Sequence, residues 1–143
     1  MKKFSILAAF VFAVMISSTA LAANWVLIET LNSDDVVSKT YVDKDSIKRG
    51  IHSEKLNFSR EDGFSVVVKT VFEFKDKKNP LTMIMSVGLF EENGAKKYCV
   101  FEISDEKGSV TPGSSDKLEI SNADGSDGTI WPAVWDYVQK NLP

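Results

Sequence analysis

The chain has 143 residues, with 17 Lys and Arg against 20 Asp and Glu, which gives a formal net charge of −3. A mildly acidic chain lacks the clustered positive charge that nucleic acids and anionic membrane surfaces attract, so we expect no nucleic-acid partner. With one Cys and one His, it forms neither an intramolecular disulfide framework nor a Cys/His zinc site.

Residues 1–22 match the three parts of a secretory signal peptide. Met1-Lys2-Lys3 is positively charged, and Phe4–Ile16 is an apolar run of 13 residues. Ala20-Leu21-Ala22 then supplies an Ala-x-Ala cleavage site. The apolar run is shorter than the ~20 residues of a membrane-spanning helix. No Cys stands at the cleavage site for lipid attachment, so we expect no stable membrane anchor.

Cleavage after Ala22 leaves residues 23–143, a chain of 121 residues with 15 basic and 20 acidic side chains, because Lys2 and Lys3 are removed. This length suits a single secreted domain and is too short for a second core. The short positive start and the Ala-x-Ala site are typical of bacterial export. We therefore expect a bacterial protein located in the periplasm, secreted, or at the cell surface.

The first part of this domain contains short strands separated by polar turns. In chain order we expect a strand at Trp25–Leu31, a polar turn at 32–38, a strand at Thr40–Val42, a tight or helical turn at 43–48, a strand at Ile51–Arg60 and a turn at Glu61-Asp62-Gly63. In the tight turn, Asp43 or Asp45 is expected to supply the capping oxygen.

Three central segments alternate apolar and polar residues, the pattern of strands with one buried face. They are Phe64–Lys75, Leu81–Phe90 and Tyr98–Ser104. On the first, the even-numbered side chains form the buried face. The charged break at Lys75–Pro80 and the Asn93-Gly94 turn, which tolerates positive φ, separate the three segments and predict a meander.

The last part of the chain predicts loops and then a helix. Lys107–Lys117 and Asn122–Gly128 are expected loops, with a brief strand at Leu118–Ser121 between them. Trp131, Trp135, Val138 and Leu142 are spaced as one helix face, so we expect an amphipathic helix over Pro132–Leu142. The predicted fold is therefore α+β: a single antiparallel sheet of about five to six strands, with this helix packed on one face.

Few residues point to catalysis. His52 has no nucleophile or orienting acid near it in the sequence, so we expect an exposed surface His and not a general base. Cys99 is expected to share a buried face with Phe101 and Ile103 as an unpaired core residue; an intermolecular bridge is the alternative. The sequence contains no nucleophile elbow, phosphate loop or dinucleotide motif. We therefore expect no catalytic residue and no cofactor.

Two acidic segments are candidates for a calcium site. Asp43-Lys44-Asp45 resembles the start of an EF-hand loop, but Lys48 stands where that loop requires Gly. Asn122–Asp127 supplies oxygen ligands without a bidentate Glu. We expect a plain loop there that caps the final helix through Asp127 or Thr129, and the sequence leaves weak calcium binding at Asn122–Asp127 open.

Three features follow one another behind the signal peptide: Trp25, the stretch Tyr41-Val42-Asp43-Lys44-Asp45-Ser46-Ile47-Lys48-Arg49, and the alternating strand Val66–Phe74. In this order they resemble the surface-adhesin protein E-like family of small exported bacterial proteins. The resemblance covers the first half of the predicted domain. It implies an antiparallel sheet with helical packing, similar to a PAS domain, and for the family's namesake the binding of host matrix proteins. The chain differs from that family in lacking a second Cys and a lipidation Cys.

These observations favour an exported, non-catalytic binding domain that contacts a protein, a matrix component or a small ligand through a sheet face or edge. Besides a sheet edge, the expected contact surface is the face bearing Lys69, Val71 and Glu73. Val67 and Val71 on that face also mark a candidate homodimer interface.

The alternative is a small periplasmic enzyme with an unrecognised acidic site. Glu91/Glu92 and Glu102/Asp105 are the carboxylate pairs that such an enzyme offers. Sequence alone does not give the separation of two carboxylates across a cleft, on which glycosidase chemistry depends.

The signal peptide yields a direct prediction. The exported protein should begin at Ala23, because the Ala20-Leu21-Ala22 site follows an apolar run of the correct length. Intact-mass measurement of the exported protein tests this, and a mass that still includes residues 1–22 would contradict it.

Overall fold

The computed structural model describes residues 23–112 and 117–143. The predicted signal peptide, residues 1–22, lies outside these residues, as do residues 113–116 of the predicted loop at Lys107–Lys117. Within the described part of the chain, no helix is both long enough and apolar enough to cross a membrane.

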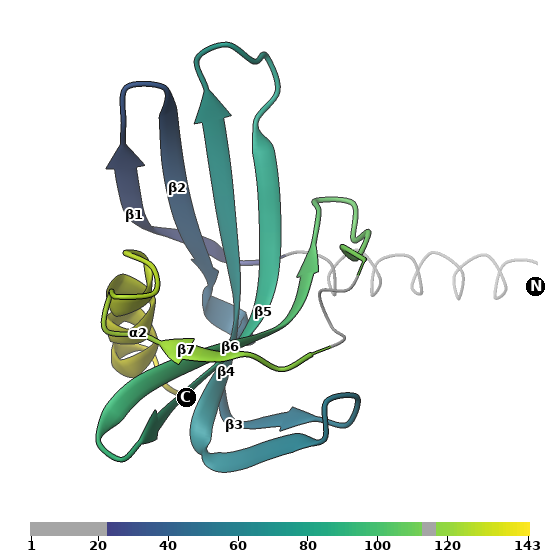
Figure 1. Ribbon diagram of the computed structural model, residues 1–143, viewed down its shortest axis with the longest axis vertical. Helices are drawn as coiled ribbons and strands as arrows, with labels where there is room; N and C mark the ends of the chain where they lie inside the picture. Colours follow the sequence, from purple (N-terminus) through teal and green to yellow (C-terminus); the bar gives the residue numbers. More distant parts are fainter. Residues whose placement is uncertain (1–22, 113–116) are drawn as a thin grey trace, which may run out of the picture.

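Across the described residues, seven strands form one antiparallel sheet and one α-helix packs against it (Figure 1). The strands are β1 (Trp25–Asn32), β2 (Val36–Asp43), β3 (Lys48–Ser53), β4 (Phe58–Phe74), β5 (Leu81–Glu92), β6 (Ala95–Ser104) and β7 (Ile120–Asn122). A short 3-10 turn, η1 (Lys44–Ser46), joins β2 to β3, and α2 (Trp131–Lys140) is the C-terminal helix. The α+β architecture is the predicted one, with more strands than the five to six expected.

The sheet departs from a simple meander at β3. The strand order is β1-β2-β4-β5-β6-β7, and β3 lies off this path, paired with β4. At 17 residues, β4 is long enough to pair with β2 through Val68–Phe74 and with β3 through Phe58–Ser65. Because β5 occupies the other edge of β4, β2 and β3 share one edge. The meander predicted for the three central segments is confirmed in β4, β5 and β6.

β4 bends where its pairing with β3 is irregular. The register passes from Arg49↔Phe64 to Ile51↔Arg60, so two steps along β3 correspond to four along β4. Glu61-Asp62-Gly63 therefore stand opposite the single residue Gly50, and the two additional residues form a bulge within the strand. The sequence-based assignment of these residues to a turn between two strands is therefore wrong.

The hairpin turn lies instead at residues 54–57. Asn57 has a φ of 50°, and its N–H donates to the Glu54 carbonyl at 3.2 Å. Asn adopts this left-handed conformation more readily than most residues. The turn therefore forms at Asn57 and not at the Gly-containing segment 61–63, which the prediction favoured. The Asn93-Gly94 turn is confirmed, with φ values of 53° and 79° between β5 and β6.

The predicted tight turn after β2 is η1. The Asp43 carboxylate accepts the Asp45 N–H at 3.2 Å, which confirms Asp43 as the capping oxygen. Ser46 Oγ donates to the Asp43 carbonyl at 2.7 Å and accepts the Val67 N–H at 2.8 Å, which ties η1 to β4. Ile47 is buried in the main core. These motif residues therefore act structurally.

α2 crosses the strands on one face of the sheet. At its start, the ring of Trp131 stacks on that of Tyr98 in β6, with centroids 3.7 Å apart. Beyond its end, Arg49 Nε of β3 donates to the Pro143 carbonyl at 3.2 Å. The helix therefore runs from β6 towards β3. Its buried residues confirm the predicted amphipathic stripe; they are Trp131, Val134, Trp135 and Val138.

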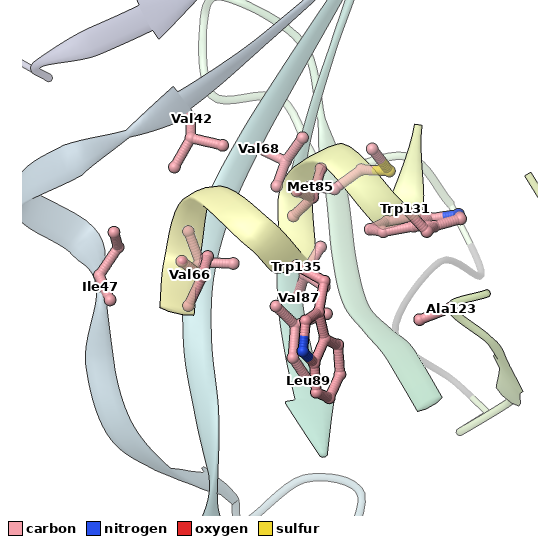
Figure 2. Packing of buried hydrophobic residues seen from close by; sticks show 12 residues of the cluster. Val42, Ile47, Val66, Val68, Met85, Val87, Leu89, Ala123, Trp131 and Trp135 are labelled. Carbon is pink, nitrogen blue, oxygen red and sulfur yellow. The ribbon is translucent and has the colours of Figure 1, made fainter. Parts of the chain in front are cut away.

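The main core lies between α2 and the sheet (Figure 2). Its buried residues are Val42, Ile47, Val66, Val68, Met85, Val87, Leu89, Ala123, Trp131, Val134, Trp135 and Val138. On β4 and β5 these residues alternate, which confirms the predicted buried faces. Complete burial of a side chain of this size contributes about 2 kcal/mol or more, so the two tryptophans are a large share of the stability of a small domain.

A second, smaller core lies on the opposite face of the sheet. Ile51, Phe90 and Cys99 are buried there, with Phe58 and Phe101 packed against them. Ile51 and Phe58 come from the β3–β4 hairpin, whereas the others belong to β5 and β6. The bend in β4 therefore folds this hairpin over the helix-free face.

A bulge in β6 places one side chain on the face of the sheet opposite to the predicted one. The β5–β6 register shifts at Phe101, which is one residue more than β5 requires. Side chains beyond a bulge exchange faces. Cys99 and Phe101 consequently lie in the second core, whereas Ile103 packs against the main core. The expectation that all three share one face is wrong for Ile103.

The packing of α2 predicts the outcome of one substitution. Trp135 is 3% exposed, so Trp135→Ala should lower the free energy of unfolding by about 3–5 kcal/mol through lost burial and an unfilled cavity. Urea denaturation measures this. The matched control is Gln139→Ala, an exposed position of the same helix, which should change stability by less than about 0.5 kcal/mol. Equal midpoints for the two variants would contradict the packing.

Candidate functional site

The helix-free face is hollowed beside the β3–β4 hairpin. A groove of about 670 Å³ lies there, lined by η1, β3, β4, β5 and β6. Small-molecule sites commonly occupy roughly 300–1,000 Å³. Because the bend in β4 brings these five elements together, the groove depends on the tertiary arrangement of the whole sheet.

The lining combines apolar, hydroxyl and charged side chains. The apolar ones include Ile51, Val67 and Phe101; the hydroxyls are Ser46, Ser53, Ser59, Ser65 and Ser86; the charged or titratable ones are Asp45, Lys48, Arg49, His52, Arg60 and Glu61. Three cations and two carboxylates nearly balance, so the groove has little net charge. Such a lining suits a polar ligand that offers both donors and acceptors.

The serine hydroxyls differ in how much hydrogen-bonding capacity remains for a ligand. Ser46 Oγ both donates and accepts within the fold, and Ser65 Oγ donates to the Gly50 carbonyl at 2.5 Å. Ser53 Oγ accepts the Leu56 N–H at 3.3 Å, which leaves its own proton for donation. Ser53 therefore retains hydrogen-bonding capacity on the groove side of the hairpin.

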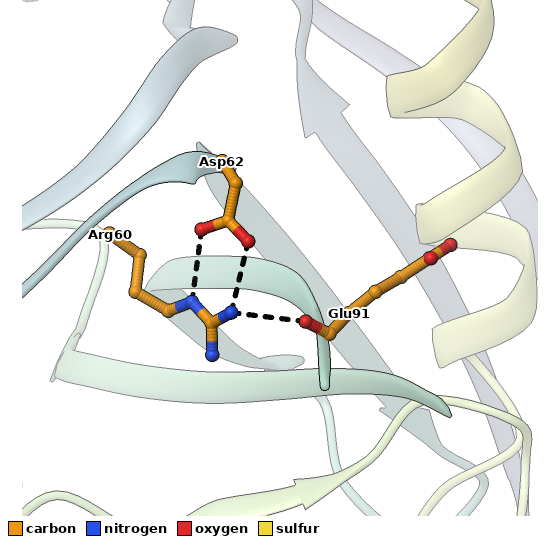
Figure 3. Close-up of polar contacts among 3 residues, drawn as sticks. All are labelled: Arg60, Asp62 and Glu91. Atoms are coloured by element: carbon orange, nitrogen blue, oxygen red, sulfur yellow. Dashed lines mark hydrogen bonds and ion pairs between the residues drawn. The ribbon is translucent and has the colours of Figure 1, made fainter. Parts of the chain in front are cut away.

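Arg60 and Asp62 hold the bend in β4 (Figure 3). Arg60 Nε donates to Asp62 Oδ1 at 3.0 Å, and Nη2 donates to Oδ2 at 2.9 Å and to the Glu91 carbonyl at 3.1 Å. The guanidinium carbon also lies 4.5 Å from the centroid of the Phe90 ring. The hydrogen bonds raise the pKa of Arg60 and lower the pKa of Asp62. Because the pair is near solvent, it fixes geometry more than it adds stability.

The predicted contact face continues along β4 beyond the groove. The Lys69 ammonium lies 4.5 Å from the Trp25 ring centroid and 4.8 Å from that of Tyr41. Glu73 forms an ion pair with Lys39 at 3.3 Å. Lys69 and Glu73 therefore both contact side chains of β1 or β2. The contact between Lys69 and Trp25 is a cation–π interaction.

The two valines of the predicted contact face are half-buried. Val67 lines the groove, whereas Val71 lies further along the same face of β4. The structure thus brings one of the four predicted contact residues to the groove, together with residues that the sequence analysis did not select.

His52 is exposed, as predicted, and it lines the groove. It pairs across the hairpin with Ser59. No hydrogen bond joins the two side chains in the described part of the chain. A nucleophile and its base are normally within hydrogen-bond reach of each other, so this pair does not have the geometry of an activated serine.

Cys99 is completely buried and unpaired, which confirms the prediction. Its Sγ donates a weak hydrogen bond to the Gly88 carbonyl at 3.8 Å. A Cβ at position 88 would lie 2.9 Å from Phe101 Cε2 and 3.0 Å from Cys99 Sγ, so only Gly fits there without rearrangement. Burial raises the pKa of the Cys99 thiol to about 11. The thiol is therefore a core group with little thiolate character.

In the acidic loop before α2, the Asp124 and Asp127 carboxylates accept hydrogen bonds from nearby residues of the same segment. Asp127 accepts the Asn122 N–H at 2.6 Å. Asp124 accepts the Ser126 N–H at 3.0 Å and the Ser126 hydroxyl at 2.6 Å, and these bonds lower the pKa of Asp124. Among the described residues, no group of three or more His, Cys, Asp or Glu side chains is placed to hold a metal ion.

The N-cap residue of α2 differs from the one that the sequence predicted. The N-cap residue is Ile130, which makes no side-chain capping hydrogen bond. Capping by Asp127 or Thr129 is therefore wrong. Pro132 in the first turn removes one of the N–H groups that a cap would satisfy.

The carboxylate pairs considered for an enzyme lie away from the groove. Glu91 and Glu92 are exposed at the end of β5, and neither they nor Glu102 and Asp105 line the groove. Asp105 accepts the N–H groups of two residues in its own turn, Lys107 and Ser109, each at 2.9 Å. The acidic residues that do line the groove are Asp45 and Glu61.

Sequence reasoning did not identify the groove because its lining comes from three separated segments, 45–53, 59–67 and 86–101. The β3–β4, β4–β5 and β5–β6 pairings join them. The isolated serines Ser53, Ser59 and Ser65 gave no signal that differs from ordinary polar positions on a strand.

Comparison of the chain with protein-family models, with curated proteins and with solved structures finds no match.

The burial of Cys99 predicts its reactivity. A rise in pKa from 9.0 to about 11 leaves about 100-fold less thiolate at pH 8 than in an unfolded chain, so native alkylation should be slower by at least that factor. The native rate should keep rising through pH 9–11, where the unfolded thiol has already ionised. Iodoacetamide labelling followed by mass spectrometry measures both rates. Equal native and unfolded rates would contradict the burial.

Proposed function

We propose that this protein is an exported, non-catalytic binding domain that holds a small polar ligand in the groove on its helix-free face. The groove itself is the observation that carries the proposal. Its volume of about 670 Å³ falls in the range of small-molecule sites, and its lining includes apolar groups and convergent polar groups.

The chemistry of the lining narrows the ligand. Lys48 stands against Asp45 and Glu61, while Arg49 donates to the Pro143 carbonyl and Arg60 is paired with Asp62. This balance favours a neutral or zwitterionic ligand over a strongly charged one. Serine hydroxyls both donate and accept, and Phe101 offers an apolar surface. A polyhydroxylated or zwitterionic molecule with one apolar side therefore fits best.

Two sequence features support a binding role outside the cytoplasm. Residues 1–22 have the pattern of a cleaved signal peptide. The Tyr41–Arg49 stretch resembles a family of exported proteins whose namesake binds matrix proteins. A protein partner would use the same face of β4, which carries Val67 at the groove and Lys69 and Glu73 beyond it.

An enzymatic role is the second candidate, because the only His of the chain lies in the groove. His52 pairs across the hairpin with Ser59, and Asp45 and Glu61 line the same groove. Movement on substrate binding would be needed to bring His52 and Ser59 into hydrogen-bond contact. The non-catalytic proposal needs no such movement.

A ligand screen with a groove-blocking variant tests the proposal. The secreted protein is screened by thermal denaturation against saccharides, amino acids and other small polar metabolites. A ligand present at about 100 times its Kd should raise the melting temperature on the order of 10 °C. Ser59→Trp, an exposed groove position, should remove the shift.

Thr30→Trp is the matched control, because Thr30 is an exposed strand residue of β1 that does not line the groove. It should keep the shift. Mass spectrometry of the same mixtures should return the ligand unchanged. A shift that survives Ser59→Trp would place the site elsewhere, and reproducible conversion of the ligand would show that the protein is an enzyme.

A further inference from the structure

The groove borders the main chain of β3 and not only the side chains of one face. All six residues of β3, Lys48–Ser53, line it, and Gly50 among them has no side chain. Successive side chains of a strand point to opposite faces, so a groove that touches all six in succession also touches the strand's edge. β3 therefore presents backbone N–H and C=O groups to a ligand in the groove.

The edge of β3 that points away from β4 is unpaired. Within the described residues, β3 pairs with β4 alone, and no main-chain hydrogen bond joins residues 48–53 to any other segment. In such a pair, about half of the strand's main-chain groups point away from the partner. β1 and β7 are also edge strands, but neither lines the groove. At β3 alone, a free edge and the groove coincide.

The floor beside this edge comes from the helix-free face of the sheet. Val67 of β4 and Ser86 of β5 are cross-strand partners, and Phe101 belongs to β6, the next strand. β3 runs across the direction of β1 and β2 (Figure 1). An extended segment laid along β3 therefore crosses the floor, with its side chains pointing alternately to the floor and to solvent.

The start of β3 carries positive charge. Lys48 and Arg49 both line the groove there. Arg49 Nε already donates to the Pro143 carbonyl, whereas the Lys48 ammonium has no hydrogen-bond or ion-pair partner among the residues that the structure describes. A strand added antiparallel to β3 ends beside the first residue of β3, so its terminal carboxylate meets Lys48.

We infer that the ligand of the groove is a short peptide, which adds to the free edge of β3 as an antiparallel strand and places its carboxylate at Lys48. The inference rests on the proposed function, because it names the ligand class for the same groove. A peptide with free ends is zwitterionic, and its amides supply donors and acceptors that match main-chain groups. β3 spans about 17 Å, which accommodates a tetrapeptide.

Asp45 lines the same end of the groove as Lys48. A parallel peptide would place its terminal ammonium there, against the Asp45 carboxylate. Antiparallel pairing is slightly more stable per residue than parallel pairing, and it gives the unpaired Lys48 ammonium a partner. The two directions are distinguished by which end of the peptide matters for binding.

A library of tetrapeptides with free ends tests the ligand class. The secreted protein should retain members of the library, and mass spectrometry identifies them. Ser59→Trp should abolish retention, because it blocks the groove. If no tetrapeptide is retained while another small metabolite gives a melting-temperature shift that Ser59→Trp removes, the inference is overturned and the proposed function stands. If no ligand of any class binds, both are wrong.

N-methylation of a retained peptide tests the main-chain pairing. A methyl group on an amide nitrogen removes one donor and leaves every side chain unchanged. Only alternate nitrogens face β3, so N-methylation there should raise the Kd about tenfold or more, and at the positions between them about twofold or less. Calorimetric titration measures each Kd. Equal losses at every position, or none, would show recognition without strand pairing and would overturn the inference.

Lys48→Ala tests the direction of the peptide. It should raise the Kd of the free-ended peptide about tenfold and that of the same peptide with an amidated carboxyl end about twofold or less, because only the carboxylate makes a charge-assisted hydrogen bond. Lys44→Ala is the matched control: Lys44 is an exposed lysine of η1 outside the groove, so both Kd values should stay unchanged.

Circular dichroism confirms that each variant is folded. Equal effects of Lys48→Ala on the two peptides would overturn the inference. So would a peptide that loses binding when its amino end is acetylated but not when its carboxyl end is amidated.

Discussion

Arg60 and Asp62 form a bidentate ion pair within the irregular part of the β3–β4 pairing. Around this pair, Gly50 of β3 stands opposite three residues of β4, and Gly63 allows Ile51 to approach where any Cβ would lie 2.9 Å from the Leu89 carbonyl oxygen. The bend that results is the constraint on which the rest depends. It turns the β3–β4 hairpin over the helix-free face, while the length of β4 lets it pair with both β2 and β3 along one edge. The second core and the groove exist only because of this turn.

The two faces of the sheet are consequently covered by different means. On one face α2 supplies two buried indoles, and on the other the hairpin supplies Ile51 and Phe58. Neither cover reaches the ends of the β1–β2 and β4–β5 hairpins. The groove lies where the cover of the helix-free face ends, beside the β3–β4 hairpin.

Local patterns predicted much of the fold correctly. The alternation on β4 and β5, the Asn93-Gly94 turn, the Asp43 cap and the Trp-bearing helix are all confirmed, because each is set by side chains a few residues apart. The errors share another cause. Glu61-Asp62-Gly63 has turn-like composition but lies within a strand, and Phe101 is an extra residue that moves Ile103 to the opposite face. In both cases the pairing with a neighbouring strand overrides the local preference.

The sequence by itself determined the central strands β4, β5 and β6 apart from their bulges, the buried faces of β4 and β5, the amphipathic helix at the end of the chain, and the burial of Cys99. Periodicity carries this information, because a buried face requires apolar residues at fixed spacing. Only the tertiary structure decided which strands pair, where β4 bends, and what gathers on each face. His52 and Ser59 meet through the hairpin register, and Leu81 joins Phe72 through the β4–β5 register. Such register depends on pairings between residues far apart in the chain, and a bulge of one or two residues changes every contact beyond it.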